Sequence, residues 1–431
     1  MMEGWKTDKF KNQIQYKSGY TWSKEQELKT QEPNSVRVLT VTNIQKKLDL
    51  SEELYLQGVS EKDRKEKAVS KDWCIAVSSN GNRKRIGNAV FIKDDTDYLF
   101  ASFLTAFKPK DDSDILPDYF FRWLSSQTVQ ERITSVSEGT TGLGNLDIRY
   151  LRNMDIHFPE KPEQTAIANI LSKVDEAIAS VQESIAAAER LKKSLMQNLL
   201  TGRMKPDGTL RKEDEFYMDE KFGKVPMGWE VKKVKECFKF KNGKGNTTNN
   251  LREIPDMEYC IPVFGGNGIT GYYHSALLNE PTIVIGRVGE YCGNVFQTPA
   301  KSWVTDNAML VSEVLMKEYD IDFFTLKLNS LNFKQFSDST GQPKITQGSI
   351  GSVLFAYPSN IDEQKGIISL ISRVSNKIQQ RQNKIATLER LKKSLMQNLL
   401  TGRVRVKERI ITDNYCCPVK TGQEFFEIIE D

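Results

Sequence analysis

The side chains that most often carry catalysis are few in this sequence, and their spacing matches no common catalytic motif. Only two histidines occur, His157 and His274, which excludes an H-E-x-x-H zinc motif and argues against a site built on several histidines. The segment GKGNTT at 243–248 lacks the spacing of a phosphate-binding loop. No Pro-Pro pair occurs, so the Asn/Asp-Pro-Pro-aromatic motif of amino-methyltransferases is absent.

One carboxylate pattern has the form of a nuclease site. Asp207, preceded by proline, is followed by Asp219 and Lys221. Such a site needs carboxylates that converge on a metal ion from a rigid core. These residues lie in the polar stretch 203–223, which is typical of a linker. The sequence therefore predicts no catalytic residue and no metal ligand, and a self-contained nuclease stays only as an alternative that requires these three residues to converge.

Polar and basic side chains gather instead in turns rich in glycine and asparagine. Arg, Lys and Asn read guanine and adenine edges in the major groove, and Lys also suits phosphate. In the first half of the chain these candidates for DNA binding are Asn80, Asn82, Arg83, Lys84, Arg85 and Asn145. In the second half they are Lys244, Asn246, Asn267, Arg287, Asn294 and Lys344. Each turn has the plain alternative of being only a turn, but TGLGN (141–145) and TGQPK (340–344) recur at matching places.

The overall composition indicates which class of protein contains these turns. The chain has 431 residues, 39% hydrophobic and 27% charged, which suits a globular protein of two or three domains. The net charge of +4 does not by itself demand a nucleic-acid partner. No apolar run approaches the roughly 20 residues of a membrane span, and residues 1–19 contain no apolar signal core, so we expect a cytoplasmic protein with no membrane partner. The six cysteines show no metal-ligand or redox spacing, which favours free thiols.

The chain is a repeat of one unit. The fifteen residues ERLKKSLMQNLLTGR occur at 189–203 and again, unchanged, at 389–403. The similarity extends upstream, and the segments from Gly4 and from Gly228 share a Gly-Trp pair, several lysines and a final glycine at 19 and 243. Because the regions between these segments differ almost completely, duplication alone does not account for the identical ends.

The repeated segment has the pattern of a long helix. Pro162 and Glu163 are start signals, and apolar residues then recur every three or four positions from Ile167 to Leu199 and from Ile367 to Leu399. Gly202 and Gly402 follow as C-terminal caps. Each helix spans about 38 residues, or about 57 Å. Two exposed seams of this length predict that the helices pack on each other within the chain, antiparallel if a pseudo-twofold axis relates the units.

The polar side chains of the identical segments are predicted to face outward. Two identical outward surfaces suit two copies of one partner, whereas a solvated helix face needs polarity but not identity. The predicted partner-binding residues are Arg190, Lys192, Lys193, Gln197, Asn198 and Arg203, with their copies Arg390, Lys392, Lys393, Gln397, Asn398 and Arg403.

The fold that follows is of the α+β class. Two domains of mixed α/β character are predicted to be separated by two long antiparallel helices, which form an intramolecular coiled coil with pseudo-twofold symmetry. The expected borders are domain 1 at 1–157, helix 1 at 158–203, a linker at 204–224, domain 2 at 225–356, helix 2 at 357–403 and a tail at 404–431.

This organisation resembles that of the specificity subunits of type I restriction–modification systems. The resemblance lies in the two diverged domains with Gly-Trp entries and TG exits, and most specifically in the two helices that end LKKSLMQNLLTGR. The segments VTNI at Val41 and IPVFGGNGITGYY at Ile261 are also similar to that family, and the first adds Asn43 to the candidate DNA contacts. The tail after 403 and the interior of the first domain depart from the pattern.

The resemblance implies a non-catalytic subunit that binds double-stranded DNA. Each domain would read one half of a split, asymmetric site, and the helix pair would set the gap between the halves. Two methyltransferase subunits would dock on the helices, and two restriction subunits would join. S-adenosylmethionine, ATP and magnesium would be bound by those partners, and no cofactor by this chain. Besides the nuclease, the alternative is a coiled-coil adaptor that binds protein or RNA.

Overall fold

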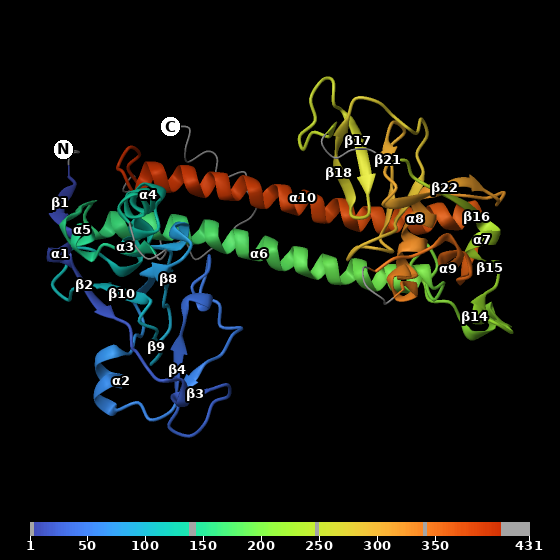
Figure 1. Cartoon of the computed structure of the whole chain (residues 1–431). Coiled ribbons are helices and arrows are strands. Elements are labelled where there is room, and N and C mark those ends of the chain that lie inside the picture. Colours follow the sequence, from blue (N-terminus) through green and yellow to red (C-terminus); the bar gives the residue numbers. More distant parts are fainter. Residues whose placement is uncertain (1–3, 138–143, 246–249, 339–342, 407–431) are drawn as a thin grey trace. The chain divides into compact units, whose positions relative to one another are not determined.

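The computed structural model describes residues 4–137, 144–245, 250–338 and 343–406, arranged in two compact units (Figure 1). Unit 1 comprises Met1–Val181 and Lys384–Asp431, and unit 2 comprises Gln182–Asn383. The helix α6 (Lys161–Leu200) begins in unit 1 and ends in unit 2, whereas α10 (Ile361–Leu399) begins in unit 2 and ends in unit 1. Each unit therefore contains the start of one repeated helix and the end of the other.

Unit 1 is built on two small four-stranded sheets. The first has the order β2 (Ile14–Ser18), β10 (Leu104–Pro109), β6 (Cys74–Val77) and β8 (Ala89–Phe91), all antiparallel. The second has the order β3 (Glu27–Leu28), β5 (Tyr55–Leu56), β4 (Val36–Leu39) and β9 (Leu99–Phe100). Two further antiparallel pairs join β1 (Lys6–Lys9) to β12 (Asp155–Phe158) and β7 (Ser79–Asn80) to β11 (Gly144–Asn145). The shorter helices are α1 (Phe10–Gln13), α2 (Glu61–Lys67), α3 (Pro117–Leu124), α4 (Gln127–Val136) and α5 (Ile148–Asn153).

Unit 2 repeats the first of these sheets with different residues. Its main sheet has the order β16 (Phe238–Asn242), β22 (Ala308–Val314), β19 (Ile283–Gly286) and β20 (Val295–Gln297). A second sheet contains β18 (Gly268–Tyr273), β17 (Ile261–Gly265) and β21 (Trp303–Val304). The pair β15 (Trp229–Lys233) and β23 (Leu354–Pro358) matches β1 and β12, and the expected linker forms a hairpin of β13 (Phe216–Asp219) and β14 (Gly223–Pro226). The shorter helices are α7 (Val234–Cys237), α8 (Ile321–Ser330) and α9 (Gln347–Gly351).

The residues shared by the two repeats serve the same local geometry in both. Gly4 and Gly228 have φ angles of +78° and +81°, which glycine adopts without strain, and each precedes a buried tryptophan. Gly19 lies against the backbone of the adjoining loop, where an added Cβ would sit 2.0 Å from the carbonyl oxygen of Ala101. Gly243 has the same close approach, at 2.2 Å from the carbonyl oxygen of Thr305. These contacts explain why the Gly-Trp entry and the later glycine recur.

The seam predicted on the long helices is confirmed. Of the predicted apolar positions between Ile167 and Leu199, and between Ile367 and Leu399, none is exposed. In unit 1, Lys392 of α10 forms a 2.6 Å ion pair with Asp175 of α6, and the guanidinium of Arg122 on α3 binds the other oxygen of the same carboxylate. Burial tends to raise the pKa of Asp175, but the hydrogen bonds from these two cations outweigh it and lower the pKa.

The last turn of each long helix belongs to a domain core. Leu399 and Leu400 are buried in the core of unit 1 with Ile167 and Leu171, and Leu199 and Leu200 occupy the matching place in unit 2 with Ile367 and Ile371. The start of one helix therefore lies beside the end of the other, which makes their packing antiparallel in each unit. The helices end as predicted, because Gly202 and Gly402 adopt φ angles of +71° and +69° and their N–H groups bond the carbonyls of Leu199 and Leu399.

A fully buried glutamine fixes the first turn of each long helix to its domain. The side chain of Gln164 accepts a 2.8 Å hydrogen bond from the N–H of Leu116 and donates to the carbonyls of Asp114 (2.9 Å) and Pro159 (2.8 Å). Gln364 repeats this pattern in unit 2: it accepts from the N–H of Asp320 and donates to the carbonyls of Glu318 and Pro358. Each glutamine therefore satisfies backbone groups at the strand end and before α3 or α8, a role that sequence reasoning missed.

We expect Gln164→Ala to lower the free energy of unfolding by about 2–4 kcal/mol, because it leaves three backbone groups at this position without their side-chain partner. Guanidinium unfolding followed by tryptophan fluorescence measures the loss. Gln197→Ala is the matched control, since Gln197 lies on the same helix but is exposed, and its change should stay within about 0.5 kcal/mol. Equal losses for the two variants would contradict the bracing role.

Candidate nucleic-acid interface

In unit 1 the structure brings two distant segments of predicted contacts together. The pairing of β7 with β11 sets Gly144 opposite Asn80 and Asn145 opposite Ser79. The turn at 80–85 follows β7 directly, and an added Cβ on Gly144 would lie 3.1 Å from Cγ of Arg83, so this basic residue lies beside β11. The recurring TGLGN motif is thus part of the same surface as the basic turn, although its residues 141–143 lie outside the described residues.

The basic turn of unit 1 is shaped by its own asparagines. The side-chain oxygen of Asn80 accepts a 2.8 Å hydrogen bond from the N–H of Asn82, and that of Asn82 accepts from the N–H of Lys84 at 3.1 Å. Arg83 and Lys84 are exposed, and among the described residues their side chains form no hydrogen bond or ion pair. The turn therefore presents two unpaired cations and two amide NH₂ groups, which are the groups that phosphates and base edges bind.

Unlike Arg83 and Lys84, the side chains of Arg85 and Asn43 bond backbone groups of the chain itself. The guanidinium of Arg85 donates to the carbonyls of Val41 (2.9 Å) and Ile44 (2.8 Å), so it ties the basic turn to the VTNI segment. Asn43 is only 3% exposed; it accepts from the N–H of Thr40 and donates to two backbone carbonyls. Its polar atoms are thus already bonded within the loop. In this structure Asn43 braces the loop, and its role as a DNA contact stays a prediction.

In unit 2 the predicted contacts converge at the corresponding ends of strands. Val288 forms a β-bridge with Lys344, which repeats the pairing of β7 with β11, and the N–H of Ile345 bonds the carbonyl of Arg287 at 2.9 Å. The carbonyl of Asn294 accepts from the N–H of Gly286 at 2.9 Å. Lys344, Arg287 and Asn294 therefore surround the end of β19.

The turn that carries Asn267 approaches the same place, and Lys244 is held beside β21. An added Cβ on Gly286 would lie 2.2 Å from the carbonyl oxygen of Gly266, so the turn that carries Asn267 lies against the end of β19. Lys244 follows β16 and is held by backbone bonds to Val304 and by the indole of Trp303, which donates to its carbonyl at 2.9 Å. Lys244, Asn267, Asn294 and Lys344 are exposed, and Arg287 is half-buried. Asn246 lies outside the described residues.

The predicted partner surface divides into exposed and half-buried residues. Arg190, Lys193 and Gln197 are exposed and spaced by three and four positions, so they share one face of the helix. The copies Arg390, Lys393 and Gln397 are exposed in the same way, as are Arg203 and Arg403. Lys192, Asn198 and their copies are half-buried, and Lys392 is engaged by Asp175 within the chain. The surface open to a partner is therefore narrower than the sequence predicted.

The structure brings no support to a nuclease site. Asp207 accepts hydrogen bonds from the N–H and hydroxyl of Thr209, and Asp219 accepts from the N–H groups of Lys221 and Phe222. Both carboxylates thus stabilise turns. Within the described part of the chain, no three His, Cys, Asp or Glu side chains gather where they could hold a metal ion.

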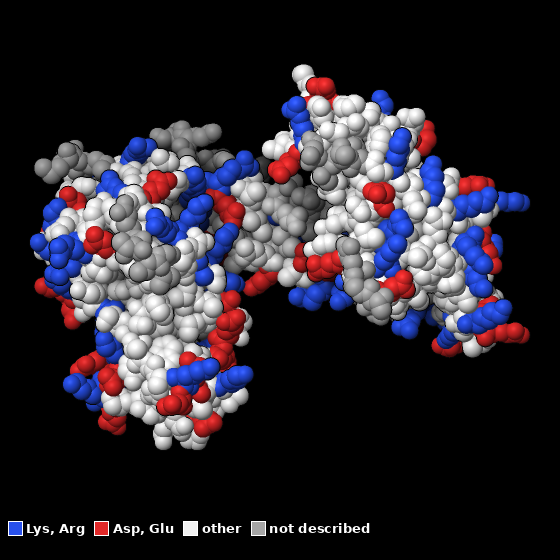
Figure 2. Space-filling view, in the orientation of Figure 1, with Lys and Arg blue, Asp and Glu red and all other residues white. Residues whose placement is uncertain are grey.

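Charge on the surface is local rather than global. On the face that Figure 2 shows, Lys and Arg are interspersed with Asp and Glu over both units. This mixture agrees with the small net charge of +4. The candidate contacts with nucleic acid are therefore the particular loops described above and not one continuous basic face. No helix among the described residues is long and apolar enough to cross a membrane.

Known proteins share this arrangement. The family described as "Type I restriction modification DNA specificity domain" matches residues 2–190 and again 226–390. The EcoprrI specificity subunit of Escherichia coli is 27% identical over 190 residues, which span 44% of this chain and 46% of that protein. The MjaVIII specificity subunit of Methanocaldococcus jannaschii is 24% identical over 313 residues, which span 67% of this chain and 71% of that protein.

Solved structures agree at the level of the fold. The S subunit of a type I restriction-modification system from M. genitalium aligns over 92% of this chain and 96% of its own, with a TM-score of 0.54 and 19% identity. A chain from a study of assembly and conformational transition of the type I R-M system aligns over 93% and 99%, with a TM-score of 0.55 and 12% identity. The fold, with one cluster of polar and basic loops in each unit, is that of a DNA-specificity protein with two recognition domains. The chain belongs to the type I restriction modification DNA specificity domain family, as the two family matches show.

The contrast between Arg85 and Lys84 can be measured on the free chain. We expect Arg85→Ala to lower the free energy of unfolding by about 1–3 kcal/mol, because two buried carbonyl contacts lose a charged donor. Lys84→Ala should change it by less than about 0.5 kcal/mol, since this side chain is exposed. Chemical denaturation of both variants decides the matter, and a loss confined to Lys84→Ala would reverse the assignment.

Proposed function

We propose that this chain is the DNA-specificity subunit of a type I restriction–modification complex and makes or breaks no bonds itself. One observation carries the proposal. Each repeat has its own four-stranded sheet of the same order, and both present exposed polar and basic loops at the equivalent end of that sheet. Because the loops differ in sequence while their supports match, each domain reads a different half-site of one double-stranded DNA. The recognised site is accordingly split and asymmetric.

The long helices serve assembly and spacing in this proposal. Two methyltransferase subunits dock on the exposed faces that contain Arg190, Lys193 and Gln197 and their copies, and two restriction subunits join the complex. The identical sequence of the two faces supports identical partners. S-adenosylmethionine, ATP and magnesium belong to those partners. The continuous helices α6 and α10 set the number of base pairs between the half-sites.

Exchanging residues 4–157 for the first domain of another such subunit should change one half-site and leave the other unchanged. The readout is single-molecule mapping of methylated adenines in a host that carries the exchanged gene with its cognate methyltransferase gene. Deleting the gene is the control, and the split motif should then disappear. If both half-sites changed, or neither did, independent reading by the two domains would be wrong.

Lengthening both helices by one heptad should widen the gap. Seven residues inserted after Val181 and seven after Asn383 add about 10 Å to each helix while keeping the apolar seam in phase. The same methylation mapping should then show a gap longer by about three base pairs, since successive pairs rise 3.4 Å. Seven residues inserted after Gly208, in an exposed turn, form the control. A gap that stays constant in the heptad variant would rule out the spacing role.

A further inference from the structure

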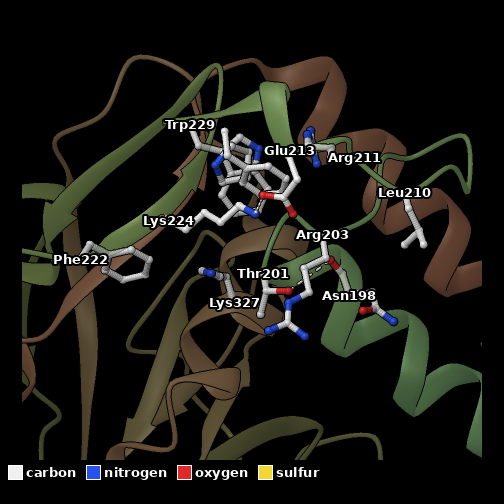
Figure 3. Close-up of a pocket in the computed structure, with 13 residues that line it drawn as sticks. Asn198, Thr201, Arg203, Leu210, Arg211, Glu213, Phe222, Lys224, Trp229 and Lys327 are labelled. Atoms are coloured by element: carbon white, nitrogen blue, oxygen red, sulfur yellow. Dashed lines mark hydrogen bonds and ion pairs between the residues drawn. The ribbon is translucent and has the colours of Figure 1, made fainter. Parts of the chain in front are cut away.

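Unit 2 contains a pocket of about 630 Å³ at the C-terminal end of α6 (Figure 3). Asn198, Thr201 and Arg203 of the repeated segment form one wall, and Lys327 enters from α8. The hairpin β13–β14 and the residues before it close the pocket, and they come from the stretch that the sequence suggested was a plain linker. The pocket shares no residue with the candidate DNA-binding loops.

The lining has an excess of positive charge. Four cations line the pocket, Arg203, Arg211, Lys224 and Lys327, against one carboxylate, Glu213. Glu213 forms an ion pair with Lys224, and Arg211 pairs with Glu363, which lies outside the lining, at 2.5 Å. Within the described residues, Arg203 and Lys327 have no carboxylate partner. Two positive charges therefore remain for an incoming anion.

Of the two cations without a carboxylate partner in the described part of the chain, Arg203 and Lys327, Lys327 gives the stronger argument for an anionic ligand. It is only 5% exposed, and its ammonium donates to the carbonyl of Leu200 at 2.5 Å and lies 5.5 Å from the ring centre of Trp229. A buried ammonium without a carboxylate is costly, and burial lowers its pKa to about 8. The Leu200 carbonyl at the helix end offsets part of this cost. A carboxylate that entered the pocket would offset more of it.

The rim of the pocket is apolar and exposed. Phe222 is 41% exposed and Leu210 is 66% exposed, and Figure 3 shows them at opposite edges of the pocket. Met218, on the same hairpin, is also exposed. Single exposed apolar residues are ordinary, but several around one cationic pocket are typical of a surface that a partner covers. The ligand then needs apolar side chains as well as an anion.

We propose that this pocket binds a carboxylate-bearing, partly apolar peptide segment of the methyltransferase subunit. The proposal rests on the proposed function, because the exposed Arg203 and Asn198, which follows Gln197 of the proposed docking face, both line the pocket. An extended peptide can cover the rim from Leu210 to Phe222 while its carboxylate meets Arg203 and Lys327. Among the described residues, which end at 406, no matching hairpin follows Arg403, and the pocket described lies at the end of α6.

A small probe tests the pocket without the partner. N-acetyl-Leu-Phe with a free carboxylate is titrated into the full chain by NMR, alongside its C-terminal amide and AMP. The free carboxylate should bind, and Arg203→Glu and Lys327→Met should each weaken it about ten-fold, since charge-assisted bonds are lost. Arg403→Glu is the matched control, because it alters the identical segment at a residue that does not line this pocket. Equal binding of the amide, preference for AMP, or an equal effect of Arg403→Glu would overturn the proposal.

Binding of the methyltransferase subunit is tested in a separate experiment. The proposal for the pocket and the proposed function of the chain can then fail independently. Thermal unfolding first shows that Lys327→Met is folded, and Phe222→Ser, outside the repeat, provides a second variant of the rim. Quantitative co-purification with the cognate methyltransferase subunit should show weaker binding of one of its two copies in both variants. Normal binding of both copies would remove the methyltransferase as the occupant even if the probe binds. Failure of the unaltered chain to bind any methyltransferase would instead refute the proposed function, whatever the probe does.

Discussion

The structure depends on a shared core: each domain is completed by the last turn of a helix that starts in the other repeat. Leu399 and Leu400 fill the core of unit 1, and Leu199 and Leu200 fill that of unit 2. Burying a leucine side chain stabilises by about 1.5–3 kcal/mol, so each pair is a large part of the few kcal/mol by which a domain is stable. This constraint explains why both helix ends keep their two leucines while the loops have diverged.

The two ends of each helix are fixed by different means. At the start, Gln164 or Gln364 bonds backbone groups that a buried strand end would otherwise leave unpaired. Glu163 and Glu363, one residue earlier, bind arginines that follow the opposite helix, Arg405 and Arg211. Both repeats therefore attach the start of a long helix to its domain in the same way, although the sequences between the repeated segments differ almost completely.

The repeats are not equivalent in detail. Glu363 also accepts a 2.8 Å hydrogen bond from the indole of Trp229, whereas the indole N–H of the matching Trp5 is buried with no partner among the described residues. Unit 2 has the hairpin β13–β14 beside the end of α6, and with it the cationic pocket. Within the described residues, the identical segments 189–203 and 389–403 thus have different neighbours.

The sequence by itself determined the repeat, the apolar seam, the capping glycines and the entry tryptophans, because these depend on local periodicity and on backbone conformations that only glycine adopts readily. The opposite roles of Arg83 and Arg85, two residues apart, appeared only in the tertiary structure, as did the burial of Asn43. The same holds for the approach of Lys327 to Leu200. Each of these depends on which carbonyls and carboxylates come near from distant segments, and residue type and spacing do not encode that proximity.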